Sequence, residues 1–262
     1  MTTTKIKGML TLDELKAKVA NGEVETILAV FPDLYGRLIG KRIVSDFFLE
    51  HTAGNGMHVC DYLLTVDMEM DVIEGYKFAN WELGYGDLHC VPDFKTLRLL
   101  TWLDKSALVI CDLQTEPGHQ PVEVAPRTIL NRQIERLAEA GYSAKGGSEI
   151  EYFIFNENYE SAREKNYDGL NIFGWYIEDY HMLQGTKEEL LNAAARKHMD
   201  HSGIPVEFSK GEAGPGQHEL NLRYADVLEM ADRHVIYKQG LKEIAMVQGM
   251  AVTFMALDFV HF

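Results

Sequence analysis

The chain has 262 residues, 46% apolar and 25% charged, a balance typical of a globular protein with one or two domains. Its net charge of −15 argues against a nucleic-acid partner, because phosphate binding needs a basic surface. The start, "MTTTKIKGML", has no apolar signal-peptide core, and no run approaches the ~20 apolar residues that span a bilayer. We therefore predict a cytoplasmic protein that contacts no membrane. The same charge fits binding of metal ions or cationic amines.

The cysteines predict a reducing compartment. Cys60, Cys90 and Cys111 are odd in number and form no C-x-x-C pair, so a disulfide framework is not expected. His58 precedes Cys60 by two residues and His89 adjoins Cys90. Neither spacing matches a structural zinc pattern, and no zinc site of that kind is predicted.

The first part of the chain is predicted to be rich in strands. A helix is expected over residues 11–22, because Thr11 and Glu14 have the spacing of a capping box and Gly22 can end it. Apolar runs bounded by turn residues then predict strands over 24–31, up to Ile43, over 62–72 and within 98–113.

The second part alternates helices with strands. Residues 115–126 contain three prolines and one glycine and predict a linker. Helices are expected over 127–141, from a Thr186–Glu189 capping box to about His201, and over 225–248. Period-two or apolar runs predict strands over 146–155, 217–224 and 250–256.

Two pairs of glutamates are the candidate functional residues. Glu149 and Glu151 share one face of a predicted strand, with Cα atoms roughly 6.5–7 Å apart. Two carboxylates on a buried strand suit a divalent cation, although the local sequence alone favours a solvated strand end paired with Lys or Arg. Glu212 and Glu219 flank "AGPG", a turn that either brings both carboxylates together or lies on the surface.

Four segments in order resemble the glutamine synthetase superfamily, most closely its branch of γ-glutamylpolyamine synthetases and related ligases. The resemblance spans about residues 20–256 and is carried by the segments "VFPDLYGRLIGKRI", "CDLQTEPGHQPVEVAPRTILNRQIERL", "GGSEIEYFIF" and "EAGPGQHELNLRYADVLEMADRHVIYKQGLKEIAMVQGMAVTFMA". It implies an α+β fold, with an N-terminal β-grasp-like domain at 1–114 and the first half of the catalytic domain at 115–262.

The resemblance also implies a site. Glu151, Glu212 and Glu219 match ligands of the first metal, and Glu149 matches a ligand of the second. Tyr224 matches an aromatic residue that packs on the nucleotide base, with ordinary core packing as the alternative. Glu207 falls where the family places a nucleotide-contacting acid. The implied cofactors are ATP and Mg²⁺ or Mn²⁺.

The implied reaction joins glutamate to an amine through γ-glutamyl phosphate, and the family implies a homo-oligomer. Ala53 and Gly56 fall where the family's ammonium-binding Asp and Ser are expected, which favours an organic amine. The family's later Gly-Ser-Gly-x-His-x-His segment is not in the printed sequence, and the lone His261 is not assigned as a ligand. We therefore expect the chain by itself to be incomplete and inactive. The alternatives are a glutamate–ammonia ligase, and a non-catalytic remnant that binds nucleotide–metal or homologous subunits.

Overall fold

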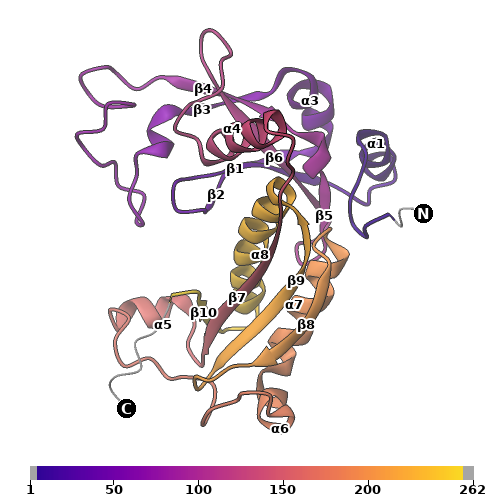
Figure 1. Ribbon diagram of the computed structural model, residues 1–262, viewed down its shortest axis with the longest axis vertical. Helices are drawn as coiled ribbons and strands as arrows, with labels where there is room; N and C mark the ends of the chain where they lie inside the picture. The colour runs from indigo at the N-terminus through magenta and orange to yellow at the C-terminus, as the bar shows by residue number, and fades with distance from the viewer. Residues whose placement is uncertain (1–4, 256–262) are drawn as a thin grey trace. The chain divides into compact units, whose positions relative to one another are not determined.

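The computed structural model describes residues 5–255, and the chain forms two compact units (Figure 1). The N-terminal unit comprises residues 8–144 with 226–235, and the C-terminal unit comprises the described residues of 1–7, 145–225 and 236–262. Helix α8, Val227–Val247, contributes to both. Sheets and helices in both units confirm the predicted α+β class. His261 and the end of the last predicted strand lie outside the described residues.

The N-terminal unit is built on a sheet of order β2-β1-β6-β4-β3, and β5 also pairs with β6. β1 and β6 are parallel, whereas the other pairs are antiparallel. The strands are β1 (Thr26–Pro32), β2 (Leu38–Val44), β3 (Met57–Cys60), β4 (Asp87–Pro92), β5 (Arg98–Leu100) and β6 (Ser106–Thr115). The helical elements are α1 (Leu12–Ala20), α2 (Ser45–Phe47), η1 (Phe48–Thr52), α3 (Ala53–Asn55), η2 (Asp61–Leu64), η3 (Phe94–Thr96) and α4 (Pro126–Glu139).

The central strands and the first helix match the prediction. β1 and β6 are buried on both faces, as expected for strands covered on both sides, and their side chains form much of the core. Thr11 caps α1: its hydroxyl accepts from the Glu14 amide at 3.2 Å, and the Thr11 amide donates to the Glu14 carboxylate at 2.8 Å. The three cysteines are free, also as predicted.

The strand predicted over residues 62–72 is wrong. Its beginning forms the short helix η2, and only an isolated bridge joins Val66 to Val72. The carboxylate of Asp67 accepts hydrogen bonds from the amides of Glu69 and Asp71 at 2.8 and 3.0 Å. These local bonds stabilise a turn at the expense of a strand ladder, which overrides the apolar alternation of the segment.

The C-terminal unit contains a sheet of order β10-β7-β9-β8. Helix α7 packs against β8, and Figure 1 shows it beside β8 and β9. The strands are β7 (Lys145–Phe155), β8 (Val206–Gly211), β9 (Gln217–Asp226) and β10 (Ala251–Thr253). The helices are α5 (Tyr159–Glu164), α6 (Met182–Gly185), the short η4 (Thr186–Glu188), α7 (Glu189–His201) and part of α8.

This sheet has two different faces. Along β7, Glu149 and Glu151 are exposed, whereas Ile150 and Tyr152 between and after them are buried. The Tyr152 hydroxyl donates to the side-chain oxygen of Asn192 on α7 at 2.6 Å, so the buried face is the one that packs on this helix. The exposed carboxylates consequently lie on the opposite face, as their period-two spacing predicts.

The capping box predicted at Thr186 and Glu189 is wrong. Thr186 already lies in the helical turn η4, and its hydroxyl donates to the carbonyl of Met182 at 2.9 Å. Helix α7 starts at Glu189, after Glu188, which makes no side-chain cap. The Thr186 hydroxyl therefore bonds to the preceding helix α6 and does not cap the start of α7 in the way that the sequence pattern predicts.

Candidate metal-binding and nucleotide-binding site

Glu212 and Glu219 meet at the hairpin between β8 and β9. The antiparallel register places Lys210 of β8 directly opposite Glu219 of β9. The Lys210 ammonium contacts the Glu212 carboxylate, and its Nζ lies 3.6 Å from Glu219 Oε2. Side chains of directly paired residues point to the same face. One cation thus lies between two carboxylates, as expected from one of the two readings of the "AGPG" turn.

The turn of this hairpin depends on Gly216. Its φ is +70°, and a Cβ there would lie 2.5 Å from Ile172 Cγ2 and 3.0 Å from the carbonyl oxygen of Ile154. Only glycine combines the left-handed conformation with so close an approach. The Gln217 amide then closes the turn on the Gly214 carbonyl at 3.0 Å. The Gly-Pro-Gly segment is therefore a built turn, not a free surface loop.

The two carboxyl groups shift each other's pKa in opposite directions. The pKa of Glu219 is raised, first by its hydrogen bond with Glu212 and then by burial. Burial also acts to raise the pKa of Glu212, but the hydrogen bonds from Glu219 and Lys210 outweigh it and lower this pKa. Two carboxylates in contact resist ionising together unless a cation stands between them. This donor set fits a hard divalent ion, which prefers oxygen ligands.

Glu151 joins this face through Gln217. The side-chain nitrogen Nε2 of Gln217 donates to Glu151 Oε2 at 2.6 Å. This bond links β7 to β9, the strand that carries Glu219. Gln217 and Glu219 are two residues apart on β9 and so point the same way. Glu149 lies two residues before Glu151 on β7 and is exposed. Strand geometry therefore places Glu149, Glu151 and Glu219 on one face of the sheet, and Glu212 joins them through its contact with Lys210.

The two predicted nucleotide-binding residues lie on the same pair of strands. Tyr224 of β9 is 63% exposed, which rules out the core-packing alternative, and Lys145 Nζ lies 5.5 Å from the centre of its ring. Glu207 is exposed on β8, where the register shifts between Val206 and Phe208. It is the extra residue of a β-bulge, a feature that redirects a side chain near functional sites.

A buried charge cluster lies behind the carboxylates and was not predicted. His218, which precedes Glu219, has Nε2 2.8 Å from Glu178 Oε2 and 3.5 Å from Glu188 Oε2. Burial lowers the pKa of His218, but these carboxylates raise it to about 9. The two carboxylates are fully buried, so their imidazolium partner is needed for stability. The cluster thereby fixes β9, and with it Glu219, to the segment that leads into α7. Only the "QHE" triplet hints at it in sequence.

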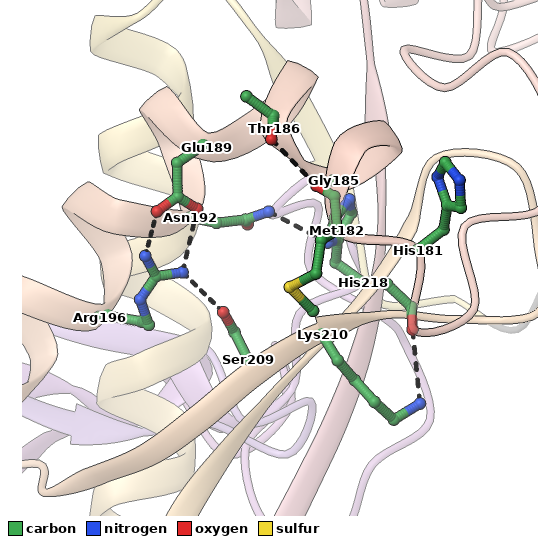
Figure 2. Close-up of a pocket in the computed structure, with 11 residues that line it drawn as sticks. His181, Met182, Gly185, Thr186, Glu189, Asn192, Arg196, Ser209, Lys210 and His218 are labelled. Carbon is green, nitrogen blue, oxygen red and sulfur yellow. Dashed lines mark hydrogen bonds and ion pairs between the residues drawn. The ribbon is translucent and has the colours of Figure 1, made fainter.

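A cavity of about 380 Å³ opens beside this cluster, between the α6–α7 segment and β8 (Figure 2). Figure 2 shows Lys210, His218 and Asn192 among its lining side chains. The guanidinium of Arg196 closes one side by pairing with Glu189 and donating to Ser209 Oγ at 2.7 Å. Lys210 thus lines the cavity and also contacts the candidate metal ligands.

Comparison with known proteins gives the class that this fold and site define. The model of the glutamine synthetase catalytic domain matches residues 123–261. The chain belongs to the glutamine synthetase family of ligases, as the sequence resemblance predicts.

Two of the similar curated relatives are named for organic amines, and others are glutamine synthetases. The chain is 44% identical over 247 residues to a γ-glutamylethanolamide synthetase, GlnA4, of Streptomyces coelicolor, covering 94% of this chain and 53% of the relative. It is 33% identical to a glutamate–isopropylamine ligase of a Pseudomonas species, covering 89% and 50%, and 30% identical to a glutamine synthetase of Thermotoga maritima, covering 95% and 53%. The chain thus spans about half the length of the curated relatives it matches.

Solved structures support the fold. GmaS without ligand matches with a TM-score of 0.77 at 24% identity, covering 95% of this chain and 54% of that one. A crystal structure of a glutamine synthase homolog matches with a TM-score of 0.73 at 18% identity, covering 87% and 50%. Among the described residues, no helix is both long and apolar enough to cross a membrane.

Proposed function

We propose that this chain supplies the metal-binding and nucleotide-binding carboxylates of an ATP-dependent ligase that joins the γ-carboxylate of glutamate to an amine. The observation that carries the proposal is the convergence of the Glu212 and Glu219 carboxylates on the Lys210 ammonium, on the face that also presents Glu151. Oxygen donors arranged in this way suit Mg²⁺ or Mn²⁺. Membership of the glutamine synthetase family supports the reaction class.

Each residue has a proposed role in this chemistry. Glu151, Glu212 and Glu219 hold one divalent ion and Glu149 contributes to a second, while Tyr224 stacks on the nucleotide base and Glu207 contacts the nucleotide. A divalent ion in such a site neutralises phosphoryl oxygens and orients the donor and acceptor groups for transfer. The protein's own part is positioning: the β7–β9 pairing and the Gly216 turn hold the carboxylates ready before any ligand arrives.

An organic amine is the favoured acceptor over ammonia. Two relatives, named as a γ-glutamylethanolamide synthetase and a glutamate–isopropylamine ligase, are 44% and 33% identical, against 30% for the Thermotoga maritima and 32% for a Mycobacterium tuberculosis glutamine synthetase. Gly56 stands where the family's ammonium-binding Ser is expected, and a Cβ there would lie 2.4 Å from His89 Nε2 and 2.6 Å from the Cys90 carbonyl oxygen. A serine therefore does not fit at this position. The glutamate–ammonia ligase remains the second candidate, supported by the glutamine synthetases among the relatives.

A chimera tests the function. Residues 1–262 are joined to the remaining half of the 44% identical γ-glutamylethanolamide synthetase, and phosphate release is measured with glutamate, ATP, Mg²⁺ and either ethanolamine, isopropylamine or ammonia. We expect turnover that prefers an organic amine and is lost in Glu219→Gln. Preference for ammonia would favour the second candidate. Binding of Mg–ATP by the chain without turnover in any chimera would favour the non-catalytic alternative.

A further inference from the structure

A cluster of histidines in the N-terminal unit lies apart from the glutamate site in sequence and belongs to the other compact unit. His58 of β3 and His89 of β4 are directly paired across the two strands, and their rings stack at 5.4 Å. Glu116 and His119 come from the turn that follows β6, which is the other neighbour of β4. Three adjacent elements thus bring imidazoles and a carboxylate to one place.

The ring nitrogens of two histidines face each other. His89 Nδ1 and His119 Nδ1 are 3.0 Å apart, and the Glu116 carboxylate completes a set of ligand atoms that all lie within 4.8 Å of one another. On the far side of the ring, His89 Nε2 lies 2.7 Å from the carbonyl oxygen of Asn55. A carbonyl oxygen only accepts, so Nε2 donates, and in the neutral ring Nδ1 carries a lone pair. That lone pair faces His119 Nδ1, and the Glu116 carboxylate lies nearby.

We propose that His89, Glu116 and His119 form a binding site for a divalent transition metal, with zinc as the ion of choice. Two imidazoles and one carboxylate are a ligand set that zinc uses in proteins, with a fourth position left open. The carbonyl of Asn55 acts as the outer partner that orients a metal-binding histidine and fixes its tautomer. Tetrahedral zinc places two nitrogen ligands about 3.3 Å apart, close to the distance between the two Nδ1 atoms.

The surroundings support a site that a metal can enter. Glu116 and His119 are exposed and His89 is half-buried, so an ion from solvent reaches all three. His58 Nε2 lies 3.3 Å from Glu116 Oε2 and holds that carboxylate beside the cluster, a positioning role. His119 has φ +50°, a conformation that few residues other than glycine adopt. The bound ion would tie this turn to β4 and stabilise the unit by linkage.

Zinc titration of the chain tests the proposal. Binding is measured by calorimetry and by competition with a chromophoric chelator. The background is Glu212→Gln with Glu219→Gln, which removes the carboxylate site, so the result is independent of the proposed function. We expect one equivalent of zinc. Glu116→Gln keeps the side-chain shape, and His119→Asn keeps a residue that tolerates positive φ; each should weaken binding at least ~10-fold. His51→Ala, at an exposed histidine of the same unit, is the matched control and should bind as before.

Two further measurements use only the unmodified chain and so do not depend on whether a variant folds. Zinc should raise the melting temperature of the unmodified chain. Bound Co²⁺ should show the visible bands of a four-coordinate nitrogen–oxygen site. A strong sulfur-to-cobalt band would assign the metal to a cysteine and overturn the proposal. So would the absence of one-equivalent zinc binding, or unchanged affinity in both Glu116→Gln and His119→Asn.

Discussion

Lys210 stands opposite Glu219 in the β8–β9 ladder, with its ammonium in contact with Glu212 as well. The Lys210 ammonium thus supplies the positive charge beside the two carboxylates, where the proposed divalent ion would bind. Its pKa is raised: burial acts to lower it, but the hydrogen bond and charge of Glu212, with Glu219, outweigh burial. A metal must therefore displace this ammonium from the carboxylates, and the aromatic ring of Tyr180, 4.5 Å from Lys210 Nζ, offers it a second partner.

The first prediction concerns this competition. Lys210→Met should strengthen Mn²⁺ binding in the absence of nucleotide by ~2–5-fold, because a partly exposed ion pair is worth up to ~1 kcal/mol. Arg163→Met, at an exposed cation on α5, is the control and should leave the affinity unchanged. Calorimetric titration measures both. Weaker Mn²⁺ binding in Lys210→Met would mean that the lysine orients the ligands and does not compete with the metal.

The second prediction separates the metal ligands from the nucleotide contacts. Glu151→Gln and Glu219→Gln should each weaken Mn²⁺ binding at least ~10-fold, because each removes a charged oxygen ligand. Glu207→Gln should keep the Mn²⁺ affinity and weaken only ATP binding, since Glu207 sits in the β8 bulge and is not one of the proposed metal ligands. Electron paramagnetic resonance of free Mn²⁺ gives the first affinity and calorimetry with ATP the second. Equal loss of metal in all three variants would contradict the assignment.

Local patterns predicted the strands that carry this site. The alternation of Glu149 and Glu151 with Ile150 and Tyr152 is a short-range signal, so the face of β7 could be read from the sequence. The same holds for Thr11 and Glu14, whose capping box forms as predicted. Such short-range patterns predict the structure correctly because few competing contacts are available within so short a segment.

Long-range charge contacts were not predictable. Glu178 and His218 are 40 positions apart, and nothing near either residue marks it as buried beside an opposite charge. Local hydrogen bonds that compete with a strand explain the wrong prediction over residues 62–72. The Asp67 carboxylate accepts from two nearby amides and so stabilises a turn there. Helix α4 forms where the sequence predicts a helix, but its Ile129 and Leu137 are exposed. The buried residue of that helix is Arg127, which no apolar pattern reveals.

The third prediction concerns Arg127, the ionic centre of the N-terminal unit. Its guanidinium donates to both carboxylate oxygens of Asp232, at 3.0 and 2.9 Å, and to Asp93 at 2.9 Å. Its side chain and that of Asp232 are 6% and 4% exposed. Removing one partner leaves a buried charge uncompensated, so Arg127→Met should lower the free energy of unfolding by ~3–5 kcal/mol.

The control for Arg127 lies on the same helix. Arg132 pairs with Glu123 at 3.1 Å, but both side chains are exposed, and Arg132→Met should cost less than ~1 kcal/mol. The double change Arg127→Met with Asp232→Leu should recover part of the loss, because it removes the most buried of the carboxylates that lose their arginine partner. Urea unfolding curves of the three variants measure this. Equal costs for Arg127→Met and Arg132→Met would show that the buried network adds little.

The last prediction concerns pH and the loop after β7. The carboxylate of Glu157 accepts from Ser161 Oγ at 2.8 Å and from the amide and side chain of Asn171 at 3.2 and 2.8 Å, and it pairs with Lys165. The hydrogen bond from Lys165, followed by those from Ser161 and Asn171, lowers the pKa of Glu157 from 4.5 to about 2.

A carboxyl group whose pKa is lower in the folded than in the unfolded chain stabilises the fold at pH values above its unfolded pKa. This stabilisation is lost as the pH falls through its folded pKa. Wild type should therefore exceed Glu157→Gln in stability at about pH 6, and the gap should close steadily below about pH 4.5. Glu160→Gln, at an exposed site on α5, should show no such closing gap. Urea midpoints measured across this pH range decide the matter, and a gap that stays constant or widens with acid would contradict it.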